Sequence, residues 1–255
     1  MTKFSANLGF LWADLPLPDA IHAAHGAGFD AVECHWPYET DTALINTALS
    51  ETGLRMLGLN TTRGNHQSGD NGLSALPARN AEARSAIDQA INYAAAINCG
   101  NIHVMAGFAA GAKAHDTFVA NLSYACTSAA QHNITILVEP LNSYDAPDYF
   151  LQTTGQAVQI IDEVDAPNLK LMFDCYHVQL MEGDLTHKLT TLLPYIGHIQ
   201  FAGVPSRGQP DFGEVNYAHI FRHIKAQGYT VPLGAEYKPQ HDTAKTLGWM
   251  THLRG

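Results

Sequence analysis

A short apolar run followed by a longer stretch of helical periodicity recurs eight times along this chain, with no linker between the units. Strands that alternate with helices pair in parallel through right-handed crossovers. Closing eight parallel strands into a barrel removes the exposed sheet edges, and such a barrel needs about 250 residues. The sequence therefore predicts an α/β fold, a (β/α)8 TIM barrel, as a single domain over residues 1–255.

Each predicted strand is a run of five or six residues rich in apolar, β-branched or aromatic side chains. The predicted strands are Phe4–Leu8, Ala31–His35, Arg55–Asn60, Asn101–Ala106, Ile134–Glu139, Leu169–Asp174, Gly197–Ala202 and Pro232–Tyr237. Apolar residues three or four apart predict helices between them. The helical patterns that are most distinct cover Asp19–Gly28, Arg79–Asn98, Lys113–His132 and a short stretch, Asp184–Leu193.

Composition restricts the class of partner. The net charge is −10 with only 14 Lys and Arg residues, and these form no cluster. Nucleic-acid binding depends on clustered basic side chains, so neither nucleic acid nor an anionic membrane surface is expected as a partner. The chain has no apolar run long enough to span a bilayer and no apolar signal region at its start. We expect a cytoplasmic protein with a small-molecule substrate. The sequence is compatible with a homo-oligomer as well as with a monomer.

The four cysteines are far apart and form no CxxC pair, which favours free thiols in a reducing compartment.

Three of the late predicted strands end in an acid, namely Glu139, Asp174 and Glu236, and the seventh offers Gln200 at the matching depth. Consecutive members of this series are 35, 26 and 36 residues apart, each about one strand–helix unit. Side chains at the carboxyl ends of barrel strands line the active site. We therefore expect these four oxygen-bearing side chains to converge on one point.

Three carboxylates brought together in a barrel mouth repel one another and lose hydration. A divalent cation removes that conflict, whereas a single acid of this kind more often caps a helix or pairs with Arg or Lys. Ligands that are all oxygen suit Mg²⁺ or Mn²⁺ better than Zn²⁺, which prefers His and Cys. The pattern predicts a metal site for Mg²⁺ or Mn²⁺.

The runs EPLNSYDAPDYFLQTT, FDCYHVQLMEGDL, GHIQFAGVPSRGQPDFGEVNY and GAEYKP resemble the hydroxypyruvate isomerase family of the xylose-isomerase-like barrels. The resemblance covers nearly the full chain, and 2-oxo-tetronate isomerases are close to it as well. It implies metal ligands at Glu139, Asp174, Gln200 and Glu236, with Glu139 and Glu236 as the catalytic acid/base pair. Related ketose epimerases usually carry His at the position of Gln200, so Gln200 favours the isomerase branch.

The expected reaction is a metal-dependent isomerisation of the aldose–ketose type, an intramolecular oxidoreduction. Hydroxypyruvate would become tartronate semialdehyde, or a 2-oxo-tetronate would be the substrate. A proton next to a carbonyl is weakly acidic, and its removal leaves an enediolate whose charge a chelated metal spreads. One glutamate removes the proton and a glutamate returns it to the next carbon. Members of the resembled family often carry Arg where this chain has Tyr144, which favours a different or longer substrate.

Several further side chains are candidates for binding the substrate. His177 follows Asp174 by three residues, and Lys238 follows Glu236 by two. Arg207 lies in the loop after the seventh strand. Arg63 and His66 lie in the long polar segment Thr61–Leu76, which we expect to cover the barrel mouth. Glu33 and His35 end the second strand on the same face, and structural roles are favoured for both.

Three other functions compete with this one. A ketose 3-epimerase would share the metal and both glutamates and would differ in the carbon and face that receive the proton. A catalytically silent sugar-acid binding protein would not exchange a substrate proton at all, and intact Glu139 and Glu236 argue against it. An endonuclease for abasic DNA would need several metals, many His ligands and a basic groove, which the net charge and Gln200 disfavour.

Overall fold

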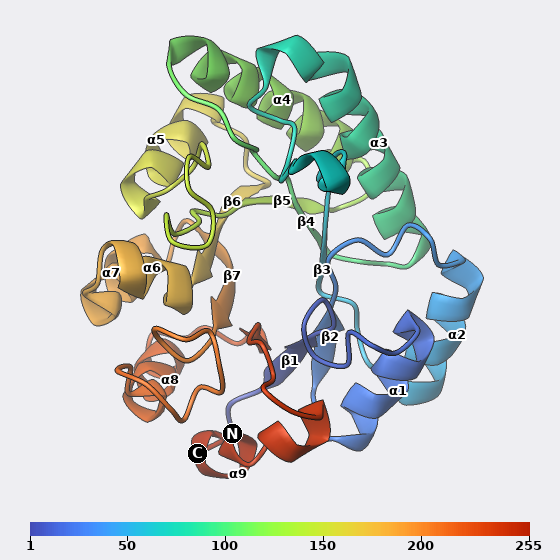
Figure 1. The fold of residues 1–255 in the computed structure, drawn as a ribbon, viewed down its shortest axis with the longest axis vertical. Helices are drawn as coiled ribbons and strands as arrows, with labels where there is room; N and C mark the ends of the chain where they lie inside the picture. Colours follow the sequence, from blue (N-terminus) through green and yellow to red (C-terminus); the bar gives the residue numbers. More distant parts are fainter.

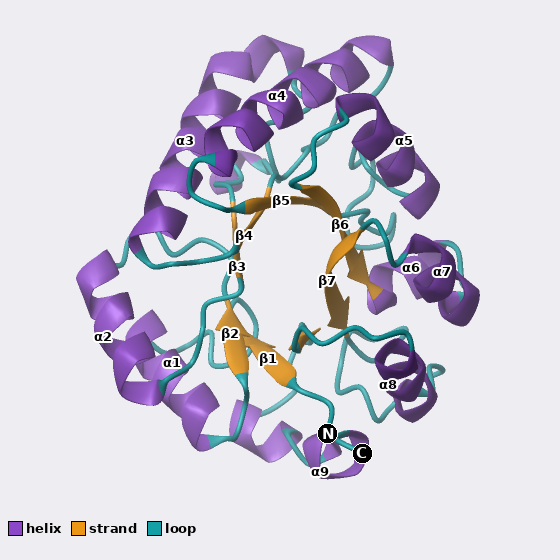
Figure 2. Ribbon diagram, turned by 180° about the vertical axis from the view of Figure 1, so that it is seen from behind, coloured by secondary structure: helices purple, strands orange, loops and turns teal.

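The computed structural model describes residues 1–255 and shows eight parallel strands arranged in a ring (Figure 2). The strands are β1 Phe4–Asn7, β2 Ala31–Glu33, β3 Gly58–Asn60, β4 Asn101–His103, β5 Thr135–Val138, β6 Leu169–Asp174, β7 Ile196–Phe201 and β8 Leu233–Ala235. Each falls within or within one residue of its predicted range, and several are shorter than predicted. The predicted TIM barrel is confirmed.

The sheet runs in the order β2-β1-β8-β7-β6-β5-β4-β3, and the ring closes between its two ends. There, the backbone N–H of Val32 donates to the carbonyl of Arg55, and the N–H of Cys34 donates to the carbonyl of Gly58, each across 3.0 Å. This closure leaves no free sheet edge.

Helices surround the ring on its outside (Figure 1). They are α1 Leu17–Gly26, α2 Thr42–Thr52, α3 Asn80–Ala96, α4 Ala112–Ala130, α5 Thr154–Val164, α6 Cys175–Met181, α7 Leu185–Leu192, α8 Tyr217–Ala226 and α9 Trp249–Leu253, with short 3-10 turns at His66–Ser68, Pro77–Arg79 and Thr243–Thr246. The four distinct helical patterns are confirmed, whereas α6 was not predicted. None of the helices is both long and apolar enough to cross a membrane.

The main core lies between the strands and the helices. Near the two termini, which lie side by side in Figure 1, an aromatic cluster joins β1, β7, α8 and α9. Phe4 contacts Phe201, Phe221 and Trp249 with ring centroids 5.0–5.8 Å apart. Truncating one such buried ring costs about 3–5 kcal/mol of stability, so this cluster fixes the last helix against the first strand.

The inside of the barrel, by contrast, is rich in polar side chains. Ser5, Asn7, Glu33, His103, His198 and Gln200 are all buried there or at strand ends. Barrel interiors are usually filled by branched apolar side chains. Buried polar groups persist when they are hydrogen-bonded or bind a ligand, so this interior points to the carboxyl end of the barrel as the place of function.

The predicted loop Thr61–Leu76 contains only a short 3-10 turn, and its residues Arg63 and Asn71 lie at that end. It is fastened by Asp70, which accepts from Nη1 of Arg79 across 2.6 Å.

Candidate active site

A cavity of about 360 Å³ opens at the carboxyl ends of the strands. Its lining combines acids, imidazoles, guanidinium groups and aromatic rings from five or more strand ends and loops. Among the lining residues are Phe10, His35, Trp36, Arg63, His103, Glu139, Asp145, His177, Arg207 and Glu236.

The three acids from late strands meet at this cavity. Glu139 directly follows β5, Asp174 is the last residue of β6, and Glu236 directly follows β8. One ligand atom from each, together with one from His177, lies within 4.8 Å of the others, and all four residues are buried. Gln200 on β7 is the register partner of Asp174, so its side chain starts beside theirs.

The two oxygens of the Asp174 carboxylate have different surroundings. Its Oδ1 accepts from the backbone N–H of Tyr176 across 2.8 Å and thereby caps α6. Its Oδ2 is buried without a hydrogen-bond partner. The cap therefore fixes the carboxylate plane and leaves one oxygen for the site.

The same cap places His177 in the first turn of α6. Its Nδ1 faces the backbone N–H of Asn142 at 3.0 Å, and since an N–H can only donate, Nδ1 must accept. Burial and the nearby Arg207 charge lower the pKa of His177 to about 3, so the ring is neutral. Its proton is consequently on Nε2, 3.6 Å from Oδ2 of Asp174. His177 is thus arranged as a hydrogen-bond donor rather than as a metal ligand.

Glu236 accepts three hydrogen bonds. Asn7 Nδ2 and His35 Nε2 donate to Oε1 across 2.9 and 3.0 Å, and Arg207 Nη2 donates to Oε2 across 2.7 Å. Burial alone would raise the pKa of Glu236, but the Arg207 charge and the His35 hydrogen bond outweigh it and lower the pKa to about 2. Glu236 is ionised at neutral pH.

The pKa values of Glu139 and Asp174 are raised, in contrast to that of Glu236. Burial, followed by the charges of Glu236 and Asp174, raises the pKa of Glu139 well above its usual range. Burial and the charge of Glu236 raise the pKa of Asp174 from 3.8 to about 7. The three acids therefore cannot all be ionised in this space without a further positive charge.

The donor set fits a hard divalent cation. Glu139 Oε1, Asp174 Oδ2 and Gln200 Oε1 are buried oxygens without a hydrogen-bond partner. Such atoms are rare in folded proteins, and several at one place need a reason. A cation bound by these oxygens and by Glu236 would satisfy them and offset the charge that raises the pKa of Glu139 and Asp174.

Arg207 places a positively charged side chain in the cavity. Its guanidinium lies 4.9 Å from the ring centroid of Phe10 and 5.1 Å from that of Tyr176. Besides Glu236, it reaches Oδ2 of Asp145 at 3.5 Å, while its Nε is buried without a partner. These contacts bring Arg207 into the cavity together with the acids.

Arg63 lies at the mouth, with its guanidinium 3.9 Å from the ring centroid of Trp36, and both residues line the cavity. The structure does not bring His66 or Lys238 into this cavity. His66 is exposed on the 3-10 turn, and Lys238 is exposed along a neighbouring groove, 5.9 Å from the ring of Phe10. Tyr144 is 78% exposed on the loop after β5.

Sequence reasoning missed the residues that hold Glu236, which are Asn7 and His35. His103 Nδ1 lies 3.4 Å from Oε2 of Glu139 but makes no hydrogen bond. The structural role favoured for His35 is thus a role within the site. A usable signal existed, because Asn7 and His103 are the last residues of β1 and β4 and His35 follows β2 closely.

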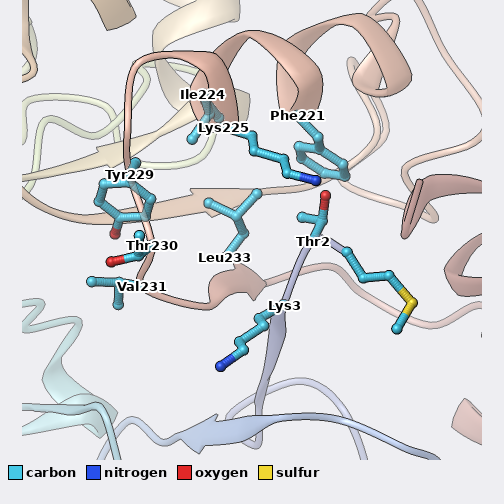
Figure 3. Close-up of a pocket in the computed structure, with 10 residues that line it drawn as sticks. Thr2, Lys3, Phe221, Ile224, Lys225, Tyr229, Thr230, Val231 and Leu233 are labelled. Carbon is cyan, nitrogen blue, oxygen red and sulfur yellow. The ribbon is translucent and has the colours of Figure 1, made fainter.

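A second hollow lies at the other end of the barrel (Figure 3). Its volume is about 260 Å³, and Figure 3 shows side chains from the chain start, α8 and the segment before β8. No carboxyl or imidazole group lines it. The amino-terminal face of such barrels serves stability, so the acid-lined cavity is the candidate active site.

Comparison with known proteins shows the family of this chain. A model of the xylose isomerase-like TIM barrel family matches residues 21–253. A 2-oxo-tetronate isomerase from Cupriavidus necator is 41% identical, with 100% of both chains covered. The hydroxypyruvate isomerase of Escherichia coli is 38% identical, also with 100% of both chains covered.

Solved structures agree on the fold. A crystal structure described as AP endonuclease, family 2, from Brucella melitensis is 35% identical with a TM-score of 0.95, covering 99% of both chains. A 3-keto-D-glucoside 4-epimerase from E. coli has a TM-score of 0.83 at 18% identity over 99% of both chains, a likeness of fold alone.

Proposed function

Because the chain belongs to the xylose isomerase-like TIM barrel family, we propose that it isomerises a small 2-oxo hydroxy acid at the cavity around Glu139 and Glu236. Its curated relatives named above are isomerases of hydroxypyruvate and of 2-oxo-tetronate. The observation that carries the proposal is a cluster of three buried carboxyl groups, of which Glu139 and Glu236 line one cavity together with two guanidinium groups.

Glu139, Asp174, Gln200 and Glu236 would hold the metal. An all-oxygen set favours Mg²⁺ or Mn²⁺. When bound, the cation supplies a Lewis acid that stabilises negative charge developing on the substrate oxygens.

The two glutamates handle the proton. One takes it from the carbon next to the carbonyl, which leaves an enediolate, and a glutamate returns it to the neighbouring carbon. Glu139 and Glu236 each contribute an oxygen to one cluster whose ligand atoms lie within 4.8 Å of one another, which favours them as the two groups that transfer the proton.

The remaining charged side chains bind and orient the carboxylate group of the substrate. Arg207 and Arg63 both line the cavity, and guanidinium groups match a carboxylate with two parallel hydrogen bonds. The Nε2 proton of His177 is available for a substrate oxygen beside Asp174. Two guanidinium groups favour a substrate with an acid group over a neutral ketose.

The length of the substrate is a choice between hydroxypyruvate and a 2-oxo-tetronate. Tyr144 stands where members of the family often carry Arg, and its side chain is largely exposed outside the cavity lining. Because Tyr144 does not line the cavity, it does not distinguish the two substrates, and both stay in the proposal. The four cysteines are buried free thiols, which fits a reducing cytoplasm as the compartment.

The test is a panel of three- to six-carbon 2-oxo acids and ketoses, incubated in deuterated water with Mg²⁺, with Mn²⁺ and with a chelator. We expect a metal-dependent shift of the carbonyl to the neighbouring carbon, with deuterium at the carbon that receives the proton. Hydroxypyruvate then gives an aldehyde, and a 2-oxo-tetronate gives a 3-oxo acid. Inversion of a ketose carbon without a carbonyl shift would instead establish a 3-epimerase. Binding of sugar acids with no deuterium exchange would establish a silent binding protein, and either result would overturn the proposal.

A further inference from the structure

Beneath the acid cluster, three buried polar side chains form a group of their own inside the barrel. Glu33 ends β2, and His198 and Gln200 lie two residues apart on β7. Oε2 of Glu33 accepts from Nε2 of His198 across 2.7 Å and from Nε2 of Gln200 across 3.4 Å. Each of the three is at most 3% exposed, so solvent cannot take over these contacts.

The neighbouring strand is shaped to leave room for this group. A Cβ placed on Gly234 of β8 would collide with Oε1 of Glu33 and would lie 2.8 Å from Cγ of Gln200 and 3.0 Å from Nε2 of His198. The backbone of Gly234 has no left-handed conformation that would require glycine. The glycine is thus explained by space, and the backbone of β8 closes over all three side chains at once.

The contact with Glu33 determines the orientation of the Gln200 side-chain amide. A carboxylate accepts hydrogen bonds, so it can be met only by the NH₂ end of the amide. With Nε2 toward Glu33, Oε1 points away from it and is buried without a partner. Asp174, the register partner of Gln200, likewise has its free Oδ2 in the acid cluster. A flipped amide would present two N–H donors to a cation and repel it.

We propose that Glu33 is a positioning residue, which holds the amide nitrogen of Gln200 so that the amide oxygen faces the metal ion. This inference rests on the proposed function in one respect only, the presence of a divalent cation at the acid cluster. His198 donates to the same oxygen, Oε2 of Glu33, so the orientation of the Gln200 amide depends on a chain of two contacts that meet at one atom. Partners that orient a metal ligand typically change metal affinity about 10- to 100-fold when removed.

The experiment compares Glu33→Met with Glu33→Gln, which match in length and charge and differ in the acceptor oxygen. Binding of Mn²⁺ to chelator-stripped protein is followed by the electron paramagnetic resonance signal of free Mn²⁺. We expect Glu33→Met to bind Mn²⁺ about tenfold more weakly than Glu33→Gln, whose amide oxygen still accepts from Gln200. In a Gln200→Ala background, this difference between the two variants should vanish.

An equal difference with and without Gln200, or no difference at all, would overturn the positioning role. If Glu33→Met fails to fold by circular dichroism, a structure of the Mn²⁺-bound wild type decides the matter. Gln200 must then place Oε1 on the metal and Nε2 toward Glu33, and any other orientation refutes the proposal. A wild type that binds no Mn²⁺ refutes it together with the metal site. Mn²⁺ affinity is measured without turnover, so an absent isomerase activity would contradict the proposed reaction alone.

Discussion

Arg207 and Glu236 form the closest charged contact in the cavity, with 2.7 Å between Nη2 and Oε2. Arg207 adopts a left-handed backbone conformation with φ of 53°, which is uncommon for a residue with a side chain. Its guanidinium is held between the rings of Phe10 and Tyr176. The conformation of the loop after β7 thus places the guanidinium group of Arg207 against the carboxylate of Glu236.

Arg207→Lys should keep the charge and lose the planar fork that fits Glu236, Asp145 and a substrate carboxylate. Hydrogen bonds to charged groups contribute about 1.5–3 kcal/mol each, so we expect kcat/KM to fall about 10- to 100-fold. The main change should be in KM, which steady-state kinetics on the active 2-oxo acid will show. An unchanged KM would mean that Arg207 serves Glu236 and not the substrate.

Glu139→Gln and Glu236→Gln each keep an oxygen that can bind a metal and remove the group that transfers the proton. General acid–base groups contribute about 100- to 10,000-fold to rate, and we expect losses of kcat in that range for both variants. Glu163→Gln is the matched control, because Glu163 is exposed and pairs with His115 on the surface. Near wild-type turnover in either cavity variant, with folding confirmed by circular dichroism, would contradict the assigned roles.

The sequence predicted the positions of the acids because strand ends are visible as an apolar run followed by an acid. It did not predict α6, since seven residues are too few for a periodicity, although Asp174 is a cap residue at its start. Lys238 would face the cavity only if strand geometry continued past Glu236, whereas β8 ends at Ala235 and Lys238 is exposed. Contacts such as Asn7 with Glu236 join strands 229 residues apart in the chain, and no local pattern reveals them.

Metal stabilisation should depend on pH, because Asp174 has its pKa raised from 3.8 to about 7 by burial and by the charge of Glu236. The folded protein holds this proton more tightly than the unfolded chain, so the associated stability is full below about pH 4 and lost as the pH rises through about 7. A cation must displace the proton. We expect the rise in Tm caused by Mg²⁺ or Mn²⁺ to increase between about pH 5 and about pH 8.

Differential scanning fluorimetry with and without metal measures this dependence, and a chelator should return each sample to its metal-free Tm. Asp174→Asn has no carboxyl proton to displace and should lose part of the pH dependence, and the remainder comes from Glu139, whose pKa is also raised. A metal-induced Tm shift that is the same at every pH would show that Asp174 is not a ligand.

The contact between Trp36 and Arg63 should set affinity for the acid end of the substrate. Arg63 is in the long loop before α3, and its guanidinium is held 3.9 Å from the ring centroid of Trp36 at the mouth. A cation–π contact contributes about 0.5–2 kcal/mol, so Trp36→Leu should raise KM for a 2-oxo acid up to about 30-fold. Because neither residue contacts the acid cluster, kcat should stay close to that of the wild type.

Trp36→Phe keeps an aromatic face and is the matched variant, so it should recover most of the affinity. Arg63→Met should raise KM at least as much as Trp36→Leu, and combining Arg63→Met with Trp36→Leu should add little, because both changes remove one interaction. If the two changes multiply instead, Trp36 contacts the substrate itself, and the role given to the Arg63–Trp36 pair is wrong.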